Sequence, residues 1–164
     1  MIYYFTNVSG KVEITGENYI KVAEGKASTA TIENFSGNWT LAHNFQIGYG
    51  ENSTANICWR GGTLSFSKNG KVLYIGSGKN SSAKVEIYGG NWSTKGNMHI
   101  ASGESSSAEL LLDGGVINSS GNFYIGNNSG ASGAMIVKSG TFSVAASKDI
   151  YIGRNQNASG DLTV

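Results

Sequence analysis

The 164-residue sequence contains no proline and a single cysteine, Cys58, and only 14% of its residues are charged. One cysteine cannot form an internal disulfide, which excludes a small disulfide-stabilised scaffold. The formal net charge of +1 gives no electrostatic reason to expect nucleic acid or an acidic membrane as a partner. No apolar run approaches the ~18 residues that a membrane-spanning helix needs, so we expect no membrane insertion.

The beginning of the sequence also lacks the pattern of a secretory signal peptide, because polar residues follow Met1 to Phe5 at once. A secreted parent protein would therefore have lost its leader, or this chain is an excerpt of it. What the sequence has in quantity is glycine, serine, threonine and asparagine. Hydrophobic residues reach 39% and recur at regular positions, which favours an ordered all-β chain over disorder.

A nine-residue phrase occurs six times along the chain. It begins with a branched aliphatic residue, which we call the anchor, continues with Gly or Ala, and has Gly or Asn three positions after the anchor. The six anchors are Val22, Ile47, Ile75, Ile100, Ile125 and Ile152, at intervals of 25, 28, 25, 25 and 27 residues. A period of this length is typical of a solenoid, and the anchors are its predicted structural core.

Apolar residues recur at fixed distances from each anchor and predict three short strands per repeat. Around Ile47 they are Phe45, Ile57, Trp59 and Leu64, which lie two positions before and ten, twelve and seventeen positions after it. Alternate apolar positions describe strands with one buried face. The predicted fold is an all-β, right-handed parallel β-helix of about seven rungs of ~25 residues, a rod roughly 34 Å tall.

Small residues mark the predicted corners of each rung. The first corner has Gly or Asn three positions after the anchor, and we expect this residue to adopt a left-handed conformation. These residues are Gly25, Gly50, Gly78, Gly103, Asn128 and Asn155. The second corner has glycine fifteen positions after the anchor, at Gly37, Gly62, Gly90, Gly115 and Gly140. Insertions fall only in the third corner, which is the variable loop.

Residues 1–164 are predicted to form a single solenoid. Residues 1–19 are an atypical terminal rung in which Ile2 is the anchor, and residues 20–164 are regular rungs, the last of them incomplete at Val164. Asn34 occupies a position that is apolar in the other complete rungs. It either lies inward as a hydrogen-bonded residue, or the strand bulges so that Phe35 takes its place.

From about residue 20 to residue 164, the repeats resemble the Gly-rich β-strand repeats of bacterial autotransporter passengers and related large surface adhesins. The matching segments are Tyr74-Ile75-Gly76-Ser77-Gly78, Tyr151-Ile152-Gly153, Ser159-Gly160-Asp161-Leu162-Thr163-Val164 and Gly89-Gly90. The resemblance is specific for the architecture. It implies an extracellular or cell-envelope stalk that is often adhesive.

We expect the residue before each anchor to point outward and to stack with its equivalents in the neighbouring rungs. This column consists of Lys21, Gln46, Tyr74, His99, Tyr124 and Tyr151. Its aromatic members, Tyr74, His99, Tyr124 and Tyr151, are a candidate binding surface, because an aromatic face gives apolar contact to a sugar ring. The competing interpretation is that outward aromatic residues pair with each other and stabilise the sheet.

Other polar residues do not form a recognisable catalytic or metal-binding pattern. The outward carboxylates Glu33, Glu86 and Glu109 are the acidic candidates, but Lys84 offers simple charge pairing at the same place. The two histidines, His43 and His99, lie in different phases of the repeat. We therefore predict no catalytic residues, no metal site and no cofactor.

The sequence thus predicts a non-catalytic structural or adhesive solenoid at the bacterial cell surface or outside the cell. One alternative is a filament subunit that associates end to end through its Ile2 and Val164 ends. The other is a carbohydrate-binding or polysaccharide-degrading β-helix. Besides a second copy of the chain, the expected partners are glycans or a host or cell surface.

Overall fold

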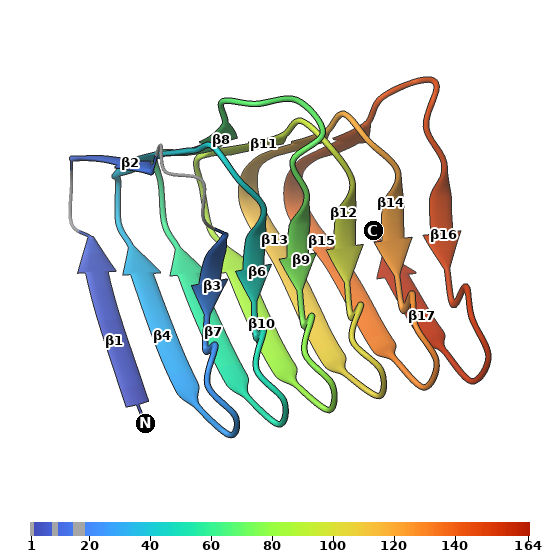
Figure 1. Ribbon diagram of the computed structural model, residues 1–164. Helices are drawn as coiled ribbons and strands as arrows, with labels where there is room; N and C mark the ends of the chain where they lie inside the picture. The colour runs from blue at the N-terminus through green and yellow to red at the C-terminus, as the bar shows by residue number, and fades with distance from the viewer. Residues whose placement is uncertain (1, 8–9, 15–18) are drawn as a thin grey trace.

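The computed structural model describes residues 2–7, 10–14 and 19–164 (Figure 1). Every regular element in these segments is a strand, and the strands pair in parallel to form a β-solenoid of about six turns, close to the predicted seven. The chain ascends through the rear strands and descends through the front strands as the turns advance from left to right, which makes the coil right-handed (Figure 1). The described residues include no helix that is long and apolar enough to cross a membrane.

The first strands of the rungs form one sheet of six short strands. These strands are β3 (Ile20–Val22), β6 (Phe45–Ile47), β9 (Leu73–Ile75), β12 (Met98–Ile100), β14 (Phe123–Ile125) and β16 (Ile150–Ile152). The anchors pair with each other from rung to rung, from Val22 and Ile47 through to Ile125 and Ile152. The predicted first strand and its register are therefore confirmed.

The second and third strands belong to a larger sheet that wraps around the rest of the coil. The second strands are β1 (Ile2–Asn7), β4 (Thr29–Asn34), β7 (Thr54–Trp59), β10 (Ser82–Ile87) and β17 (Ser159–Thr163). The third strands are β2 (Lys11–Ile14), β5 (Asn38–Leu41), β8 (Thr63–Phe66) and β11 (Asn91–Thr94). In two rungs the second and third strands merge into β13 (Ser107–Ser119) and β15 (Ser132–Val144), whose pairing shifts register around Asp113. Those two rungs have two strands instead of the predicted three.

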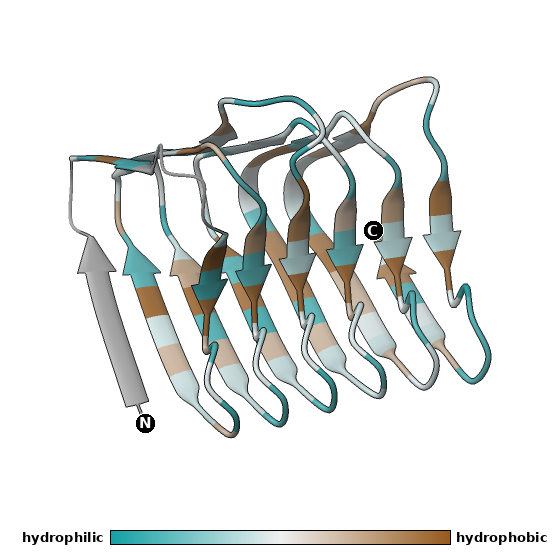
Figure 2. Ribbon diagram, viewed as in Figure 1, coloured by the Kyte–Doolittle hydropathy of each residue, from teal (hydrophilic) through white to brown (hydrophobic). Residues whose placement is uncertain are grey.

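Inward side chains form a continuous apolar core along the coil. Brown bands recur at the same height of successive strands in Figure 2, as the repeat predicts. The anchors Ile47, Ile75, Ile100 and Ile125 are fully buried, whereas Ile152 in the last rung is 47% exposed. Trp59 and Trp92 pack edge to face in the same core, with 5.3 Å between their ring centroids. Burial of stacked apolar columns between neighbouring rungs holds a solenoid together.

The predicted register of the first rung is wrong. Ile2 does not pair with an anchor: it lies opposite Thr29, at the start of the second strand, and Phe5 lies opposite Ile32. Val12 lies opposite Trp39 and thus belongs to the third strand. The error has a simple cause, because the same alternation of apolar residues describes all three strands of a rung and cannot tell one from another.

The prediction for the first corner is also wrong in its backbone conformation. The left-handed residues lie one and five positions after the anchor, for example Ala101 and Ser105, each non-glycine, at φ values of 56° and 54°. Gly103, three positions after the anchor, is not among the residues with positive φ. A Cβ atom at Gly103 would instead lie well inside 3.0 Å of the Gly78 carbonyl oxygen. Glycine is needed here because the corners of neighbouring rungs stack closely.

A buried serine closes the same corner. The hydroxyl groups of Ser28, Ser81 and Ser106, six positions after their anchors, donate hydrogen bonds of 2.6, 2.8 and 2.8 Å to the carbonyl oxygens of Gly25, Gly78 and Gly103, respectively. At the second corner four of the five predicted glycines, Gly62, Gly90, Gly115 and Gly140, have positive φ, and Gly37 does not. The fixed spacing of the nine-residue phrase therefore accounts for the first corner, including the serine hydroxyl groups that bond to its backbone.

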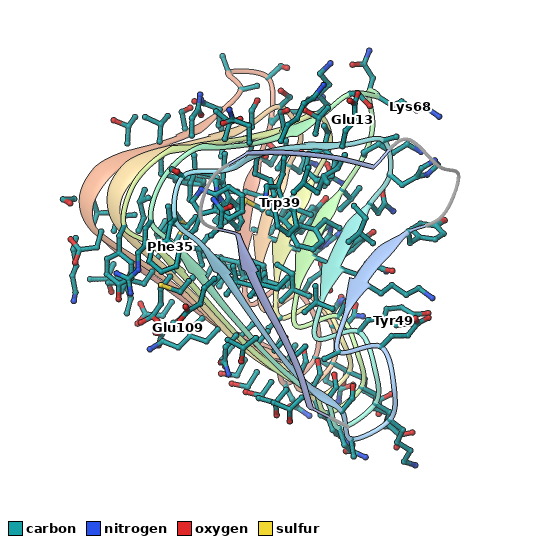
Figure 3. The ribbon with its side chains drawn as sticks, turned by 90° about the vertical axis from the view of Figure 1, so that its left-hand side faces the viewer. Glu13, Phe35, Trp39, Tyr49, Lys68 and Glu109 are labelled. Carbon is teal, nitrogen blue, oxygen red and sulfur yellow. The ribbon has the colours of Figure 1, made fainter. Side chains whose placement is uncertain are left out.

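The first alternative for Asn34 is the observed one. Its side chain is fully buried, and Nδ2 donates to the carbonyl oxygen of Gly61 at 2.8 Å, while Oδ1 accepts from Trp39 Nε1 at 3.2 Å. Phe35 turns outward and is 39% exposed. A view turned by 90° shows Trp39 inside the coil and Phe35, Tyr49 and Glu109 directed outward from it (Figure 3). Hydrogen bonding offsets the cost of burying the amide.

Candidate binding surfaces on the outside of the coil

The predicted aromatic column is a continuous stack on the sheet of first strands. Tyr74, His99, Tyr124 and Tyr151 lie directly opposite one another on β9, β12, β14 and β16. Their successive ring centroids are 5.0, 4.4 and 4.9 Å apart, with interplanar angles of 21°, 6° and 8°. These are stacked arrangements, which stabilise neighbouring strands beyond simple burial.

The stacking determines which parts of the rings a ligand can reach. Each inner ring has a neighbouring ring on both faces, and the inner ring of Tyr124 is only 7% exposed, so the middle of the column is less accessible than predicted. The Tyr151 hydroxyl donates to Asp149 Oδ2 at 3.0 Å, and Asn122 Nδ2 donates to the Tyr124 hydroxyl at 3.2 Å. A sugar ring cannot stack on a face that another ring covers. The geometry therefore favours the stabilising interpretation, and sugar binding at this column stays a prediction.

His99 is the unusual member of the stack. It is only 9% exposed, and its Nδ1 atom has no hydrogen-bond partner. Burial lowers the pKa of His99 from 6.5 to about 4, and the positive charge of Arg154 acts in the same direction. Arg154 itself lies over the rings of Tyr124 and Tyr151, at 5.4 and 5.0 Å from their centroids. His99 is thus held as a neutral imidazole at neutral pH.

We expect the unfolding free energy to fall as the pH decreases from about 6.5 to about 4. In this window the unfolded chain binds a proton at His99 and the folded chain does not, so acid favours unfolding. The pKa difference alone corresponds to about 3 kcal/mol. Attraction of an imidazolium to the two ring faces, ~0.5–2 kcal/mol, works in the opposite direction and leaves a loss of about 1–3 kcal/mol. Urea unfolding at a series of pH values measures it.

The matched control is His99→Tyr, which places in this rung the residue that three other rungs carry. This variant keeps His43 and every carboxylate, so the difference between the two pH profiles isolates His99. The difference should be level below pH 4, change between about pH 4 and 6.5, and be level again above that. Parallel profiles for the two proteins would show that His99 does not titrate differently on folding.

Two of the three acidic candidates on the second strands, Glu86 and Glu109, share one lysine. Lys84 Nζ lies 2.9 Å from Glu86 and 3.9 Å from Glu109, so it is placed between the two carboxylates. The pKa of Lys84 is raised, first by its hydrogen bond to Glu86. Cys58 lies opposite Glu86, as its position in the repeat predicts, and burial raises the pKa of its thiol. These residues form a cross-strand ion network beside a little-reactive thiol.

The histidines do not come together. His43 precedes β6 and contacts the edge of the Tyr19 ring at a centroid distance of 6.2 Å, whereas His99 lies within β12. Within the described part of the chain, no three histidine, cysteine, aspartate or glutamate side chains are grouped so that they could hold a metal ion.

A shallow depression crosses β10, β13 and β15 and is lined by Ser82, Lys84, Ser107, Glu109 and Ser132 among others.

Sequence reasoning missed two further columns. An asparagine ladder runs along the third corner: Asn97 Oδ1 accepts from the Asn122 backbone at 2.9 Å, and Asn122 Oδ1 accepts from the Asp149 backbone at 3.1 Å. The second column lies on the ridge after the second strands, where the Arg60 guanidinium carbon is 5.6 Å from the ring centroids of both Phe35 and Tyr88. Both columns recur at one phase of the repeat and could have been found from it.

Comparisons with known proteins add no family to this description. No protein-family model, no curated protein and no solved structure matches the chain.

Proposed function

We propose that the chain is a non-catalytic structural element of a bacterial surface or secreted protein, acting as a stalk, an adhesin or a matrix component. The observation that carries the proposal is that outer side chains bond to their equivalents one rung away. Lys79 pairs with Glu104 at 2.8 Å and Lys26 with Glu51 at 3.2 Å, both across neighbouring rungs. Together with the aromatic stack and the asparagine ladder, these contacts run along the coil axis and stiffen a rod.

The outer faces supply the adhesive part of the proposal. Strands of a solenoid present side chains in straight columns about 4.8 Å apart, a regular surface on which an extended partner can lie. The resemblance of the repeats to autotransporter passengers supports a location at the cell surface or outside the cell.

The test is immunolabelling of the organism that encodes the chain, with antibodies raised against the purified protein. We expect labelling of intact cells or of the medium, and loss of the cell-bound signal after protease treatment of intact cells. Labelling that requires permeabilised cells would contradict the proposed location. Cells treated in parallel for a known cytoplasmic protein control for leakage.

A second candidate is a filament subunit that stacks end to end. It is favoured by the half-exposed Ile150 and Ile152 of β16, which are 46% and 47% exposed while their equivalents in β12 are fully buried. Either a second copy or further rungs of a longer chain would cover this edge. Negative-stain imaging over a range of concentrations separates the two, because only self-association produces fibres that lengthen with concentration.

A further inference from the structure

The ridge between the second and third strands carries an exposed cluster of two aromatic rings and one arginine. Phe35, Arg60 and Tyr88 each lie thirteen positions after an anchor and directly follow β4, β7 and β10. The three strands are neighbours in one sheet, so the side chains stand in a row with Arg60 in the middle. Phe35 and Tyr88 are 39% and 40% exposed, so both rings are accessible to a ligand.

Arg60 is held by the rings and not by an acid. Its guanidinium carbon lies 5.6 Å from each ring centroid, within the range of cation–π attraction. Arg60 forms no ion pair with any residue that the structure describes, whereas Lys79 and Lys84 each have a glutamate partner. Arg60 is itself exposed, so solvent or a ligand can reach its N–H groups between the two rings. The planar guanidinium suits a carboxylate, which it binds through two hydrogen bonds.

The surface beside this cluster, at the start of the third strands, is rich in hydrogen-bonding groups. On the same three rungs, Asn38, Thr63 and Asn91 begin the third strands, are exposed, and lie opposite one another. Asn38 Oδ1 accepts from the backbone and the hydroxyl of Thr63, both at 3.0 Å, which fixes the amide and leaves its Nδ2 donors free. Amides and hydroxyls in a row suit a ligand with many hydroxyl groups.

We propose that this ridge binds the uronic acid residues of an acidic polysaccharide. The carboxylate of one sugar binds the Arg60 guanidinium, sugar rings contact Phe35 and Tyr88, and sugar hydroxyls bond to Asn38, Thr63 and Asn91. The inference rests on the proposed adhesive function and specifies acidic polysaccharides as the ligands of the adhesin. Glu33, two residues before Phe35, forms no ion pair with any described residue, so its charge opposes an anionic ligand, while Glu86 is neutralised by Lys84 at 2.9 Å.

The test is calorimetric titration of the chain with a galacturonic acid trisaccharide and, separately, with the neutral galactose trisaccharide. We expect binding of the acidic sugar that weakens as salt is added, because the contact is partly electrostatic. Arg60→Gln should weaken binding at least tenfold, or ~1.4 kcal/mol, and Arg60→Lys should restore it only in part, since lysine lacks the planar pair of donors. Glu33→Gln should strengthen it.

Arg154→Gln is the matched control, because Arg154, like Arg60, lies over two aromatic rings but on another face. It should leave binding unchanged, and thermal melting should show that each variant is folded. Equal binding by wild type and Arg60→Gln, or equal weakening by Arg154→Gln, would overturn the site. Binding of the neutral sugar alone would overturn the proposal of an acidic ligand, but it would be compatible with the proposed adhesive function. Binding of neither sugar would overturn the inference and leave the structural role untouched.

Discussion

Replacing Ile100 by Asp is expected to destroy the cooperative unfolding transition of the middle of the coil. Ile100 is fully buried and lies between Ile75 and Ile125, which are fully buried as well. The substitution removes an aliphatic side chain and places a carboxylate where no partner can reach it. A lost aliphatic side chain costs about 2–5 kcal/mol, and an unpaired buried charge adds several more. We expect a loss of about 5 kcal/mol or more, measured by thermal melting and urea unfolding.

Ile152→Asp is the control for this prediction, because it makes the same change in the same column. Ile152 is 47% exposed, so its aspartate reaches water and little apolar contact is lost. We expect a loss of about 1 kcal/mol or less. The ratio of the two effects tests the inward column directly: similar losses at both positions, or an unchanged melting temperature for Ile100→Asp, would mean that the anchors do not form the core.

The repeat made most of this core predictable. In a solenoid each rung must present an apolar residue at the same place, so position in the repeat and position in the fold are equivalent. Ile57 and Val85, and likewise Leu64 and Trp92, pair as their positions after the anchor require. The prediction at Ile2 is wrong because the six residues of β1 are too few to show a period, and their alternation fits any strand.

Other features depend on contacts that the residue types alone do not reveal. Asp113 is an example, because the residues around it do not indicate that the second strand continues through the corner into the third strand. The low pKa of His99 arises from the rings and the charge packed around it, although its place in the column was predicted. The cluster around Arg60 is recognisable from the sequence only when the residues thirteen positions after the anchors are compared from rung to rung. Its neighbours Phe35 and Tyr88 carried the signal.

Replacing Gly103 by Ala is expected to destabilise the protein by about 3 kcal/mol. The Cβ atom would lie well inside 3.0 Å of the Gly78 carbonyl oxygen, which belongs to the corner of the preceding rung. Backbone atoms on both sides are held by the ladder: Gly103 donates to the Gly76 carbonyl oxygen at 3.0 Å, and Gly78 to that of Gly48 at 2.8 Å. Separating the corners strains these bonds, and overpacking of this kind costs about 1–3 kcal/mol or more. Urea unfolding measures the loss.

Gly25→Ala is the matched control at the same position of the first regular rung. A Cβ at Gly25 would have Ser28 Cβ at 3.6 Å as its nearest described neighbour, an ordinary contact. Neither glycine has positive φ, so alanine suits both backbones and restricts both unfolded chains equally. Gly25→Ala should therefore be neutral or stabilising by up to about 1 kcal/mol. The two glycines differ in the described atoms that a Cβ would meet, so the two substitutions should change stability with opposite signs. A loss of stability at both positions would point to backbone conformation instead of stacking.

The Gly103→Asn variant tests whether a side-chain hydrogen bond can offset the steric cost of a Cβ atom at this corner, as two later rungs suggest. Asn128 and Asn155 occupy the same position of the repeat, and their Nδ2 atoms donate to the carbonyl oxygens of Ser102 and Asn127 in the preceding rung. In the Gly103→Asn variant the equivalent acceptor is the Ser77 carbonyl oxygen. One hydrogen bond contributes about 1 kcal/mol, so the larger asparagine should destabilise less than alanine by about that amount. A purely steric cost predicts the reverse order. The order of the two variants therefore decides whether asparagine at this corner is a tolerated misfit or a second solution to the stacking of rungs.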